Sequence, residues 1–253
     1  MIRIKKYIKR TIVILLIIVA LAAIAFKLYT MNYYRADTKT IKEIERAGDV
    51  VVKKYDKNTL AFFPKDVTPK AGIVFYPGGK VEYKAYSGFM YKLAERGYLC
   101  LLPRMPENLA FLRLDAASNL DLDETKVEKW YIGGHSLGGV AAGQYLSDEY
   151  SDGETKFSGL ILCASYVTSD LTDSELSTLS IYGSNDGVLN MEKYRENKKN
   201  LPDLIEKVIK GGIHSYFGCY GKQSGDGKSK ISNEEQLNEA ADIVPEWIEK
   251  NRK

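Results

Sequence analysis

Short apolar runs alternate with segments of helical periodicity along most of this chain, after a longer apolar stretch near its N-terminus. A short continuous apolar run is typical of a strand covered on both faces, whereas apolar residues three or four positions apart indicate a helix. The predicted strands are Val50–Tyr55, Thr59–Pro64, Ala71–Tyr76, Tyr98–Pro103, Val127–Gly133, Gly159–Ala164, Leu176–Tyr182 and Asp203–Ile209. The predicted helices are a short one within Arg35–Val50, then Tyr83–Arg96, Asn108–Asn119, one directly after Ser136, Met191–Asn200 and Glu234–Asn251 with a bend at Pro245.

Strands that alternate with helices in this way favour a mostly parallel sheet with helices on both faces. We therefore predict an α/β fold of three layers, in which the sheet lies between two layers of helices. The segment Gly221–Ser232 has the composition of a disordered loop. No internal repeat or low-complexity tract interrupts the alternation.

The longer apolar stretch, Thr11–Phe26, carries no charged residue. It is shorter than the roughly 20 residues that span a bilayer, but Leu28–Tyr34 adds apolar and aromatic length. Basic residues gather before it, which is typical of the cytoplasmic side, so we predict a single-pass membrane helix with the following domain outside the cytoplasm. A cleaved signal peptide is the alternative, because Ala23-Ile24-Ala25 resembles a cleavage site, and the protein would then be secreted.

The chain is thus divided into a membrane anchor or signal segment (1–34), a linker with a short helix (35–49) and the α/β domain (50–253). Residues 1–27 hold six basic side chains and no acidic one. Without these six, 30 basic residues face 33 acidic ones, so the rest of the chain has a net charge of −3 and does not suggest a nucleic-acid surface. The three cysteines are widely spaced and predict neither a disulfide framework nor a metal site.

A glycine-rich turn follows the predicted strand Val127–Gly133 and precedes a helix. It has the pattern Gly-x-Ser-x-Gly, with Ser136 between Gly134 and Gly138. A sharp strand-to-helix turn lifts a serine hydroxyl clear of the sheet in a strained backbone conformation, and only glycine avoids a clash two residues away on each side. The helix that starts after Ser136 points its amide end at the site and favours developing negative charge.

An unassisted serine is a weak nucleophile and needs a base. The chain has two histidines. His135 adjoins Ser136 and is expected to point away from it, which leaves His214 as the base. Asp186 is the candidate carboxylate that orients the imidazole, although a turn aspartate is the other interpretation of its Asn-Asp-Gly context; Asp226 is the reserve acid. Ser136, Asp186 and His214 each follow a predicted strand, so they are expected to meet at one edge of the sheet.

The chain resembles the α/β-hydrolase fold family from about Val50 to Asn251, and within it a compact, bacterial, dienelactone-hydrolase-like group. The stretches that carry the resemblance are VFYPGGKVEYKAY, LLPRMPENLAFL, GGHSLGG, YGSNDGV and IHSYFGCYGKQSGDG. The resemblance implies a three-layer hydrolase sandwich and an oxyanion hole made by the Leu137 N–H and an amide within Pro77–Lys80, for which we choose Gly79. Pro77 stands where a histidine often precedes the glycines in the family.

These residues predict a serine hydrolase that cleaves an ester, thioester or lactone through an acyl-enzyme on Ser136, without a metal or organic cofactor. A peptidase, an acyltransferase or a non-catalytic binding protein of the same fold stays open as an alternative. Only Ser165–Glu175 lies before the acid's strand, too short for a large lid, so an open site and a small acyl substrate are expected. Near the histidine, Tyr216, Phe217 and Tyr220 either line a pocket or pack beneath the loop. No obligate protein partner is evident.

Overall fold

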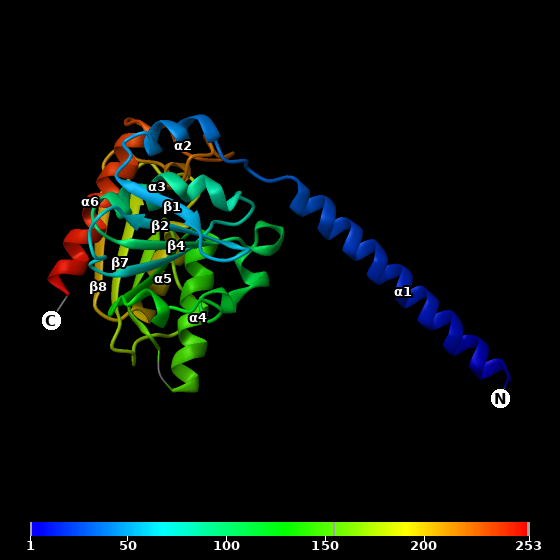
Figure 1. Cartoon of the computed structure of the whole chain (residues 1–253). Coiled ribbons are helices and arrows are strands. Elements are labelled where there is room, and N and C mark those ends of the chain that lie inside the picture. The colour runs from blue at the N-terminus through cyan, green and yellow to red at the C-terminus, as the bar shows by residue number, and fades with distance from the viewer. Residues whose placement is uncertain (1, 154, 252–253) are drawn as a thin grey trace. The chain divides into compact units, whose positions relative to one another are not determined.

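The computed structural model of the chain describes residues 2–153 and 155–251. The chain divides between Tyr33 and Tyr34 into two units, each of which is described by itself. The first unit contains one helix, α1 (Ile2–Met31; Figure 1). From Tyr7 to Met31 this helix is long and apolar enough to cross a membrane, and its most apolar window is not buried within the protein. Such a helix fits both a membrane anchor and a signal sequence.

A mostly parallel sheet forms the centre of the second unit, as the sequence predicts. Among the described residues, eight strands pair in the order β1-β2-β4-β3-β5-β6-β7-β8. The first two form an antiparallel hairpin, β2 also runs antiparallel to β4, and all the remaining pairs are parallel. The strands are β1 (Val50–Lys54), β2 (Thr59–Pro64), β3 (Gly72–Tyr76), β4 (Leu99–Pro103), β5 (Trp130–His135), β6 (Phe157–Cys163), β7 (Ser177–Gly183) and β8 (Leu204–Ile209).

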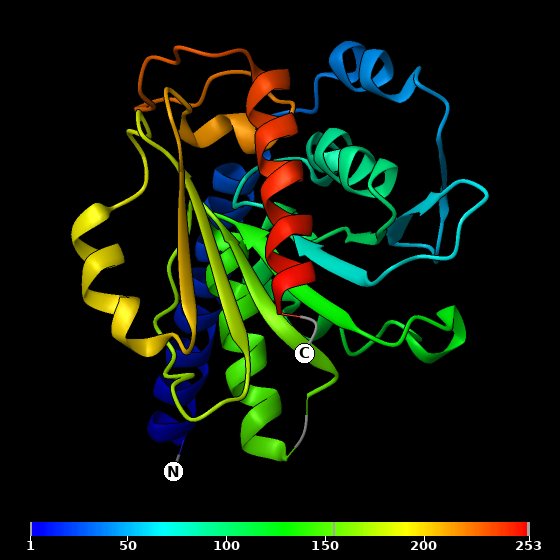
Figure 2. The same ribbon diagram turned by 90° about the vertical axis from the view of Figure 1, so that its left-hand side faces the viewer.

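Helices cover both faces of this sheet and confirm the predicted three layers (Figures 1 and 2). On one face lie α2 (Thr38–Glu45), α3 (Ser87–Glu95) and α6 (Asn233–Lys250); on the other lie α4 (Leu137–Asp152) and α5 (Met191–Asn197). The helix α2 belongs to the segment predicted as a linker, but its buried Ile41 and Ile44 pack into the core of the second unit. Helix α6 continues through Pro245.

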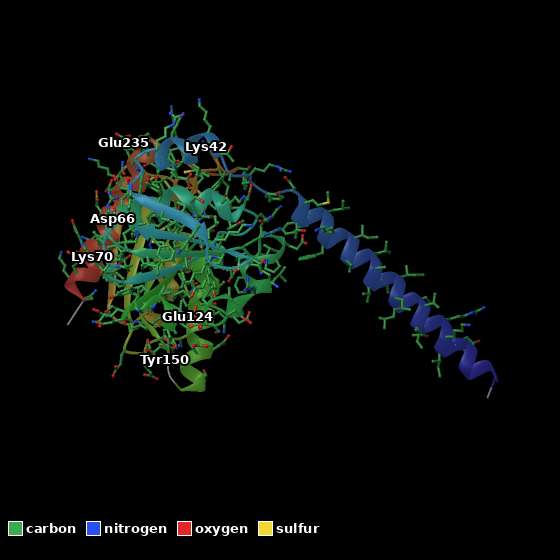
Figure 3. All side chains as sticks on the ribbon, in the orientation of Figure 1. Lys42, Asp66, Lys70, Glu124, Tyr150 and Glu235 are labelled. Carbon is green, nitrogen blue, oxygen red and sulfur yellow. The ribbon has the colours of Figure 1, made fainter. Side chains whose placement is uncertain are left out.

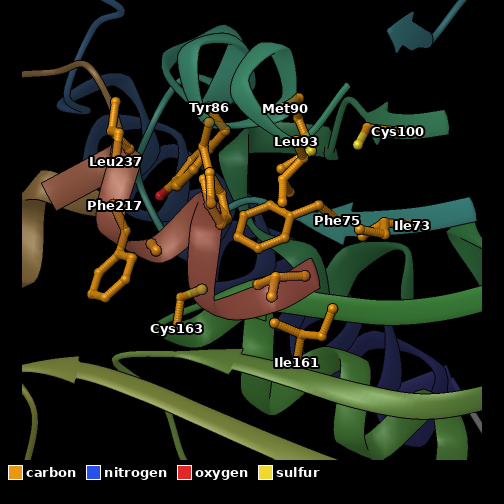
Figure 4. Close-up of a cluster of buried hydrophobic side chains, with 14 of the residues drawn as sticks. Ile73, Phe75, Tyr86, Met90, Leu93, Cys100, Ile161, Cys163, Phe217 and Leu237 are labelled. Atoms are coloured by element: carbon orange, nitrogen blue, oxygen red, sulfur yellow. The ribbon is translucent and has the colours of Figure 1, made fainter. Parts of the chain in front are cut away.

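Two hydrophobic clusters, one on each face of the sheet, hold the layers together. In the cluster beneath α3 and α6, which includes Phe75 of β3 (Figure 4), this ring makes an edge-to-face contact with Phe89 of α3, with centroids 5.5 Å apart. Phe217 and Leu237 lie in the same cluster, next to the segment that carries His214. A fully buried side chain of this size contributes roughly 1.5–3 kcal/mol, so this part of the core fixes the loops above it.

The predicted helix over Asn108–Asn119 is wrong. The structure has three short 3₁₀ turns in this region, Pro106–Asn108, Ala110–Leu112 and Leu114–Ala116. The buried Tyr76 hydroxyl accepts the Ala117 N–H at 2.9 Å and donates to the Leu114 carbonyl at 2.6 Å, so backbone groups that a helix would pair internally bond to the sheet instead. Asn108 also has a φ of 55°, which a right-handed helix does not allow.

The remaining differences from prediction lie at element ends or are short 3₁₀ turns that were not predicted, Asp123–Thr125 and His214–Phe217. The helix predicted from Tyr83 begins as a 3₁₀ turn, Tyr83–Tyr86, before α3. Cys100, Cys163 and Cys219 are free and buried, as core residues. On the surface of the second unit, side chains of both charges are interspersed, as Lys70, Glu124 and Glu235 show (Figure 3).

Candidate active site

The turn between β5 and α4 has the strained geometry that the glycine pattern predicts. Ser136 has φ 52° and ψ −123°, a conformation that side chains other than glycine rarely adopt. A Cβ atom on Gly134 would lie 2.4 Å from the Gly138 carbonyl carbon, and one on Gly138 would lie 2.2 Å from the Tyr76 carbonyl oxygen. Both glycines are therefore required by backbone contacts, which allow the turn to pack tightly against the end of β3.

Hydrogen bonds from β6 and the loop after it hold Ser136 in this conformation. Its N–H donates to the Cys163 carbonyl at 3.0 Å, and the Ser165 hydroxyl donates to the Ser136 carbonyl at 2.7 Å. A strained residue persists only where its surroundings over-determine it, and these bonds supply that support. Ser165 was not identified from the sequence, where nothing distinguishes it from an ordinary loop serine.

Asp186 and His214 meet as a buried pair. The Asp186 Oδ2 atom lies 2.9 Å from Nδ1 of His214, and the two side chains are 2% and 1% exposed. The other carboxylate oxygen accepts the N–H groups of Val188 and Leu189, both at 2.8 Å. Because an ionised carboxylate only accepts hydrogen bonds, the imidazole donates from Nδ1 and keeps the lone pair of Nε2 free to accept a proton.

The Nε2 atom of His214 is buried and has no hydrogen-bond partner among the described residues. His214 and Ser136 both line a cavity of about 170 Å³, together with Leu137, Val140, Ala164, Ser165, Tyr166, Val188, Leu189 and Asn190. The serine hydroxyl does not bond to Nε2 in this structure. Such bonds commonly tighten when substrate binds, and the shared cavity is where a reacting carbonyl group would contact both side chains.

The oxyanion loop (residues 77–80) lies directly against the serine turn. Pro77 has no N–H, the Gly78 N–H donates to the Tyr86 hydroxyl at 3.0 Å, and the Lys80 N–H donates to the Asn108 carbonyl at 2.8 Å. Among the described residues, Gly79 is therefore the member of this loop whose N–H has no hydrogen-bond acceptor. A Cβ on Gly79 would lie 2.6 Å from a methyl carbon of Leu137, so these two residues are in contact.

A buried hydrogen-bond chain links the oxyanion loop to the loop that carries His214, here called the base loop (residues 210–220). The Tyr86 hydroxyl, which accepts the Gly78 N–H, lies 2.8 Å from Nδ1 of His135. Nε2 of His135 lies 3.1 Å from the His214 carbonyl oxygen. The carbonyl requires an N–H donor, so Nε2 of His135 carries a proton; in the neutral ring, Nδ1 then accepts from the Tyr86 hydroxyl. Burial, together with the neighbouring His214, holds the pKa of His135 well below its usual value.

Comparison with known proteins shows to which family the chain belongs. Residues 72–238 match the model of the alpha/beta hydrolase family, which is more than half of the chain. The chain belongs to that family. No match was found among curated protein sequences. The narrower resemblance to dienelactone-hydrolase-like proteins stays a prediction.

Three solved structures show the same fold. A structure from a study of two esterases of the fungus Rhizomucor miehei has a TM-score of 0.56 and 16% identity, and the alignment covers 79% of this chain and 84% of that one. A CIB-like hydrolase from Thermoplasma acidophilum has a TM-score of 0.52 and 16% identity, with coverage of 78% and 98%. MGS-MChE2, an alpha/beta hydrolase enzyme from the metagenome of Mar Chica lagoon sediments in Morocco, has a TM-score of 0.56 and 17% identity, with coverage of 80% and 100%.

The aromatic residues after His214 do not line the hydrolase cavity. Phe217 is fully buried, with its ring 5.8 Å from that of His135, and the Tyr220 ring lies 5.6 Å from that of Tyr34. Tyr216 is not among the lining residues either. The cavity is lined instead by side chains from α4 and from the loops after β6 and β7. In the described part of the chain, no group of three or more His, Cys, Asp or Glu side chains is placed to hold a metal ion.

Proposed function

We propose that this alpha/beta hydrolase is a serine hydrolase that cleaves a carboxylic ester, thioester or lactone through an acyl-enzyme on Ser136. The proposal depends on one observation above all: Nε2 of His214 is unpaired, its ring is oriented by Asp186, and it lines the same cavity as Ser136. A buried imidazole nitrogen without a hydrogen-bond partner costs free energy of folding, and a role as acceptor of the serine proton explains why this nitrogen is unpaired.

In the first half of the reaction, Oγ of Ser136 attacks the substrate carbonyl carbon while its proton passes to Nε2 of His214. Asp186 holds the ring and stabilises the imidazolium that forms. The carbonyl oxygen becomes an oxyanion next to the N–H groups of Leu137 and Gly79. When the tetrahedral intermediate collapses, the bond to the leaving group breaks and that group takes the proton from Nε2.

In the second half, water loses a proton to His214 as it attacks the acyl-enzyme. The same two amides stabilise the second oxyanion, and the proton returns to Oγ as the acid leaves. The start of α4 at Leu137 adds the positive end of a helix dipole at this point. Removal of one such donor typically costs about 3 kcal/mol of transition-state stabilisation.

The size of the cavity supports a small acyl group. Its 170 Å³ is close to the roughly 150 Å³ of an engineered cavity that binds benzene. Val140, Val188 and Leu189 give its wall an apolar part that suits a short alkyl or ring group. The apolar helix α1, which is long enough to cross a membrane, supports the further proposal that the catalytic domain is tethered outside the cytoplasm and acts on small acyl compounds there.

The test uses the full chain in detergent micelles, p-nitrophenyl butyrate as substrate and a fluorophosphonate as a covalent probe of activated serines. We expect the unmodified chain to hydrolyse the ester and to be labelled on Ser136. In Ser136→Ala, labelling disappears and kcat/KM falls at least about 10³-fold, because the nucleophile is lost. Ser151→Ala, at an exposed position in α4, is the control and keeps both.

Equal hydrolysis by the unmodified chain and Ser136→Ala would contradict this mechanism. An unmodified chain that neither hydrolyses the ester nor accepts the probe would favour a binding protein that keeps only the fold.

A further inference from the structure

Asp226 is a buried carboxylate outside the cavity that the proposed mechanism does not use. It lies in the segment between the base loop and α6 and is 8% exposed. Its Oδ1 atom accepts the N–H groups of Gly187 at 3.2 Å, His214 at 3.1 Å and Gly227 at 2.8 Å. Its Oδ2 atom accepts the N–H and the hydroxyl of Ser215, both at 2.8 Å. It contacts the backbone of His214, so it is not the acid that orients the imidazole.

Apart from the Gly227 N–H, these donors come from both sides of the Asp186–His214 pair. Gly187 directly follows Asp186 in the loop after β7, here called the acid loop (residues 184–190), whereas His214 and Ser215 belong to the base loop. The Asp226 carboxylate therefore bonds both to Gly187, which follows Asp186, and to the backbone of His214.

Backbone packing shows that this arrangement is close-fitting. A Cβ on Gly187 would lie 2.7 Å from the Gly225 carbonyl oxygen, and one on Gly227 would lie 1.7 Å from the Asn185 carbonyl oxygen. The Asn185 side chain also donates to the Lys228 carbonyl at 2.8 Å. Glycine at positions 187 and 227 lets the acid loop touch the segment around Asp226. This contact places Asp226 between the acid loop and the base loop.

The ionised form of Asp226 suits this environment. Burial opposes ionisation, but the hydrogen bonds from the Ser215 N–H and hydroxyl, and from the N–H groups of Gly187 and Gly227, outweigh it and lower the pKa of the carboxyl group. An ionised carboxylate only accepts, and every partner here is a donor. In Asp226→Asn, the side-chain NH₂ would replace one carboxylate oxygen and face N–H or O–H donors to which it cannot bond. The change therefore removes hydrogen bonds while it keeps the shape of the side chain.

We propose that Asp226 is a positioning residue, which holds the acid loop and the base loop at the separation at which Asp186 bonds to His214. This role rests on the proposed function, because it acts through that pair. It predicts a loss of kcat rather than of binding, since Asp226 does not line the cavity. A displacement of about 1 Å at such a pair can cost about 10²-fold in rate.

The experiment is a double-mutant cycle on the full chain, with p-nitrophenyl butyrate as substrate, at a temperature at which circular dichroism shows each variant to be folded. We expect Asp226→Asn to lower kcat about 10²-fold and to change KM less than about threefold. In an Asp186→Asn background, the same change should cost less than about fivefold, because the pair that Asp226 positions is already broken. Asp56→Asn is the matched control; this turn carboxylate of the β1–β2 hairpin also accepts an N–H and a hydroxyl, from Asn58 and Thr59.

Asp226→Asn with at least half of the original kcat, or an equal cost in both backgrounds, would overturn the positioning role. If Asp226→Asn does not fold, Ser215→Ala decides, because it removes only one donor; it should lower kcat about threefold alone and leave kcat unchanged in the Asp186→Asn background. Loss of the proposed function itself would appear differently, as full activity in Ser136→Ala.

Discussion

His135 and Ser136 are neighbours in the chain, yet their side chains have opposite environments. Ser136 lines the cavity, whereas His135 is 1% exposed and bonds to Tyr86 and to the backbone of His214. The strand β5 ends at His135 and the strained turn begins at Ser136, so the backbone reverses between the two side chains. His135, which the motif does not require, thus supports the loop that carries His214.

The buried, neutral state of His135 predicts a pH dependence of stability. Its pKa in the folded protein lies well below the value of about 6.5 expected in the unfolded chain, so below pH 6.5 the unfolded state binds more protons. The contribution of neutral His135 to the free energy of unfolding is therefore fully present above pH 6.5 and is lost as the pH falls. Between pH 7.5 and 5.5 the free energy of unfolding should drop more in the unmodified chain than in His135→Asn, by on the order of 1 kcal/mol.

Denaturant unfolding at the two pH values, followed by circular dichroism, measures this difference. An identical pH dependence in both proteins would mean that the pKa of His135 is the same in the folded and unfolded states, which would contradict the lowered pKa of this buried ring.

Helix α6 shows how one element fixes a loop of the site. The side chain of Gln236 accepts the Ile213 N–H at 2.9 Å and donates to the Ile213 carbonyl at 2.8 Å, next to His214. The first turn of the helix is fixed by a capping box, in which Ser232 and Glu235 bond to each other's backbone N–H groups. The cap contributes to stability, whereas Gln236 holds the base loop.

Removal of this cap should therefore reduce stability without reducing activity. Ser232→Ala is expected to cost about 1 kcal/mol and to lower Tm by about 2–4 °C, while kcat at 25 °C stays within about twofold, because the Gln236 bonds remain. A thermal melt and the ester assay on the same preparation measure both. Ser151→Ala, which removes an exposed hydroxyl within α4, should change the free energy of unfolding by less than about 0.5 kcal/mol. A large loss of kcat in Ser232→Ala would show that the cap and the site are coupled.

At the scale of the whole molecule, the surfaces of the two units suit different solvents. The side chains of α1 from Leu15 to Val19 are apolar and more than half exposed, an arrangement that water disfavours and lipid accepts. The second unit instead buries its apolar side chains in two clusters and presents charged ones outside. This contrast supports a membrane-tethered enzyme.

The tether is tested by the fractionation of cells that produce the full chain. We expect the protein to stay in the membrane fraction after an alkaline carbonate wash. The double change Leu16→Arg and Val19→Arg should release it, since each charge near the centre of a membrane helix costs roughly 2.5–3.5 kcal/mol. Val67→Arg, at an exposed apolar position of the second unit, should stay in the membrane. Release of the unmodified chain, or a shortened N-terminus on sequencing, would favour a cleaved signal peptide.

The sequence alone determined those features in which the local backbone or local burial dictates the type of residue. The apolar runs predicted every strand of the sheet; the central strands, such as β3 and β4, need them because they are buried along their whole length, whereas the edge strand β1 is mostly exposed. The glycines of Gly-x-Ser-x-Gly marked the sharp turn, because a Cβ on Gly134 would meet the backbone of Gly138 and one on Gly138 would meet the end of β3 at Tyr76. The helix predicted over Asn108–Asn119 was wrong because Tyr76, which is distant in the sequence, forms hydrogen bonds with backbone groups of this segment.

Only the tertiary structure decided which polar groups pair and which stay free. Gly79 stands out in the oxyanion loop because Tyr86 and Asn108 occupy the amides on either side of it. Asp186 rather than Asp226 bonds to the imidazole, although both are aspartates next to a glycine in a loop. Hydrogen bonds between residues distant in sequence depend on how the layers pack, and neither periodicity nor composition records that packing.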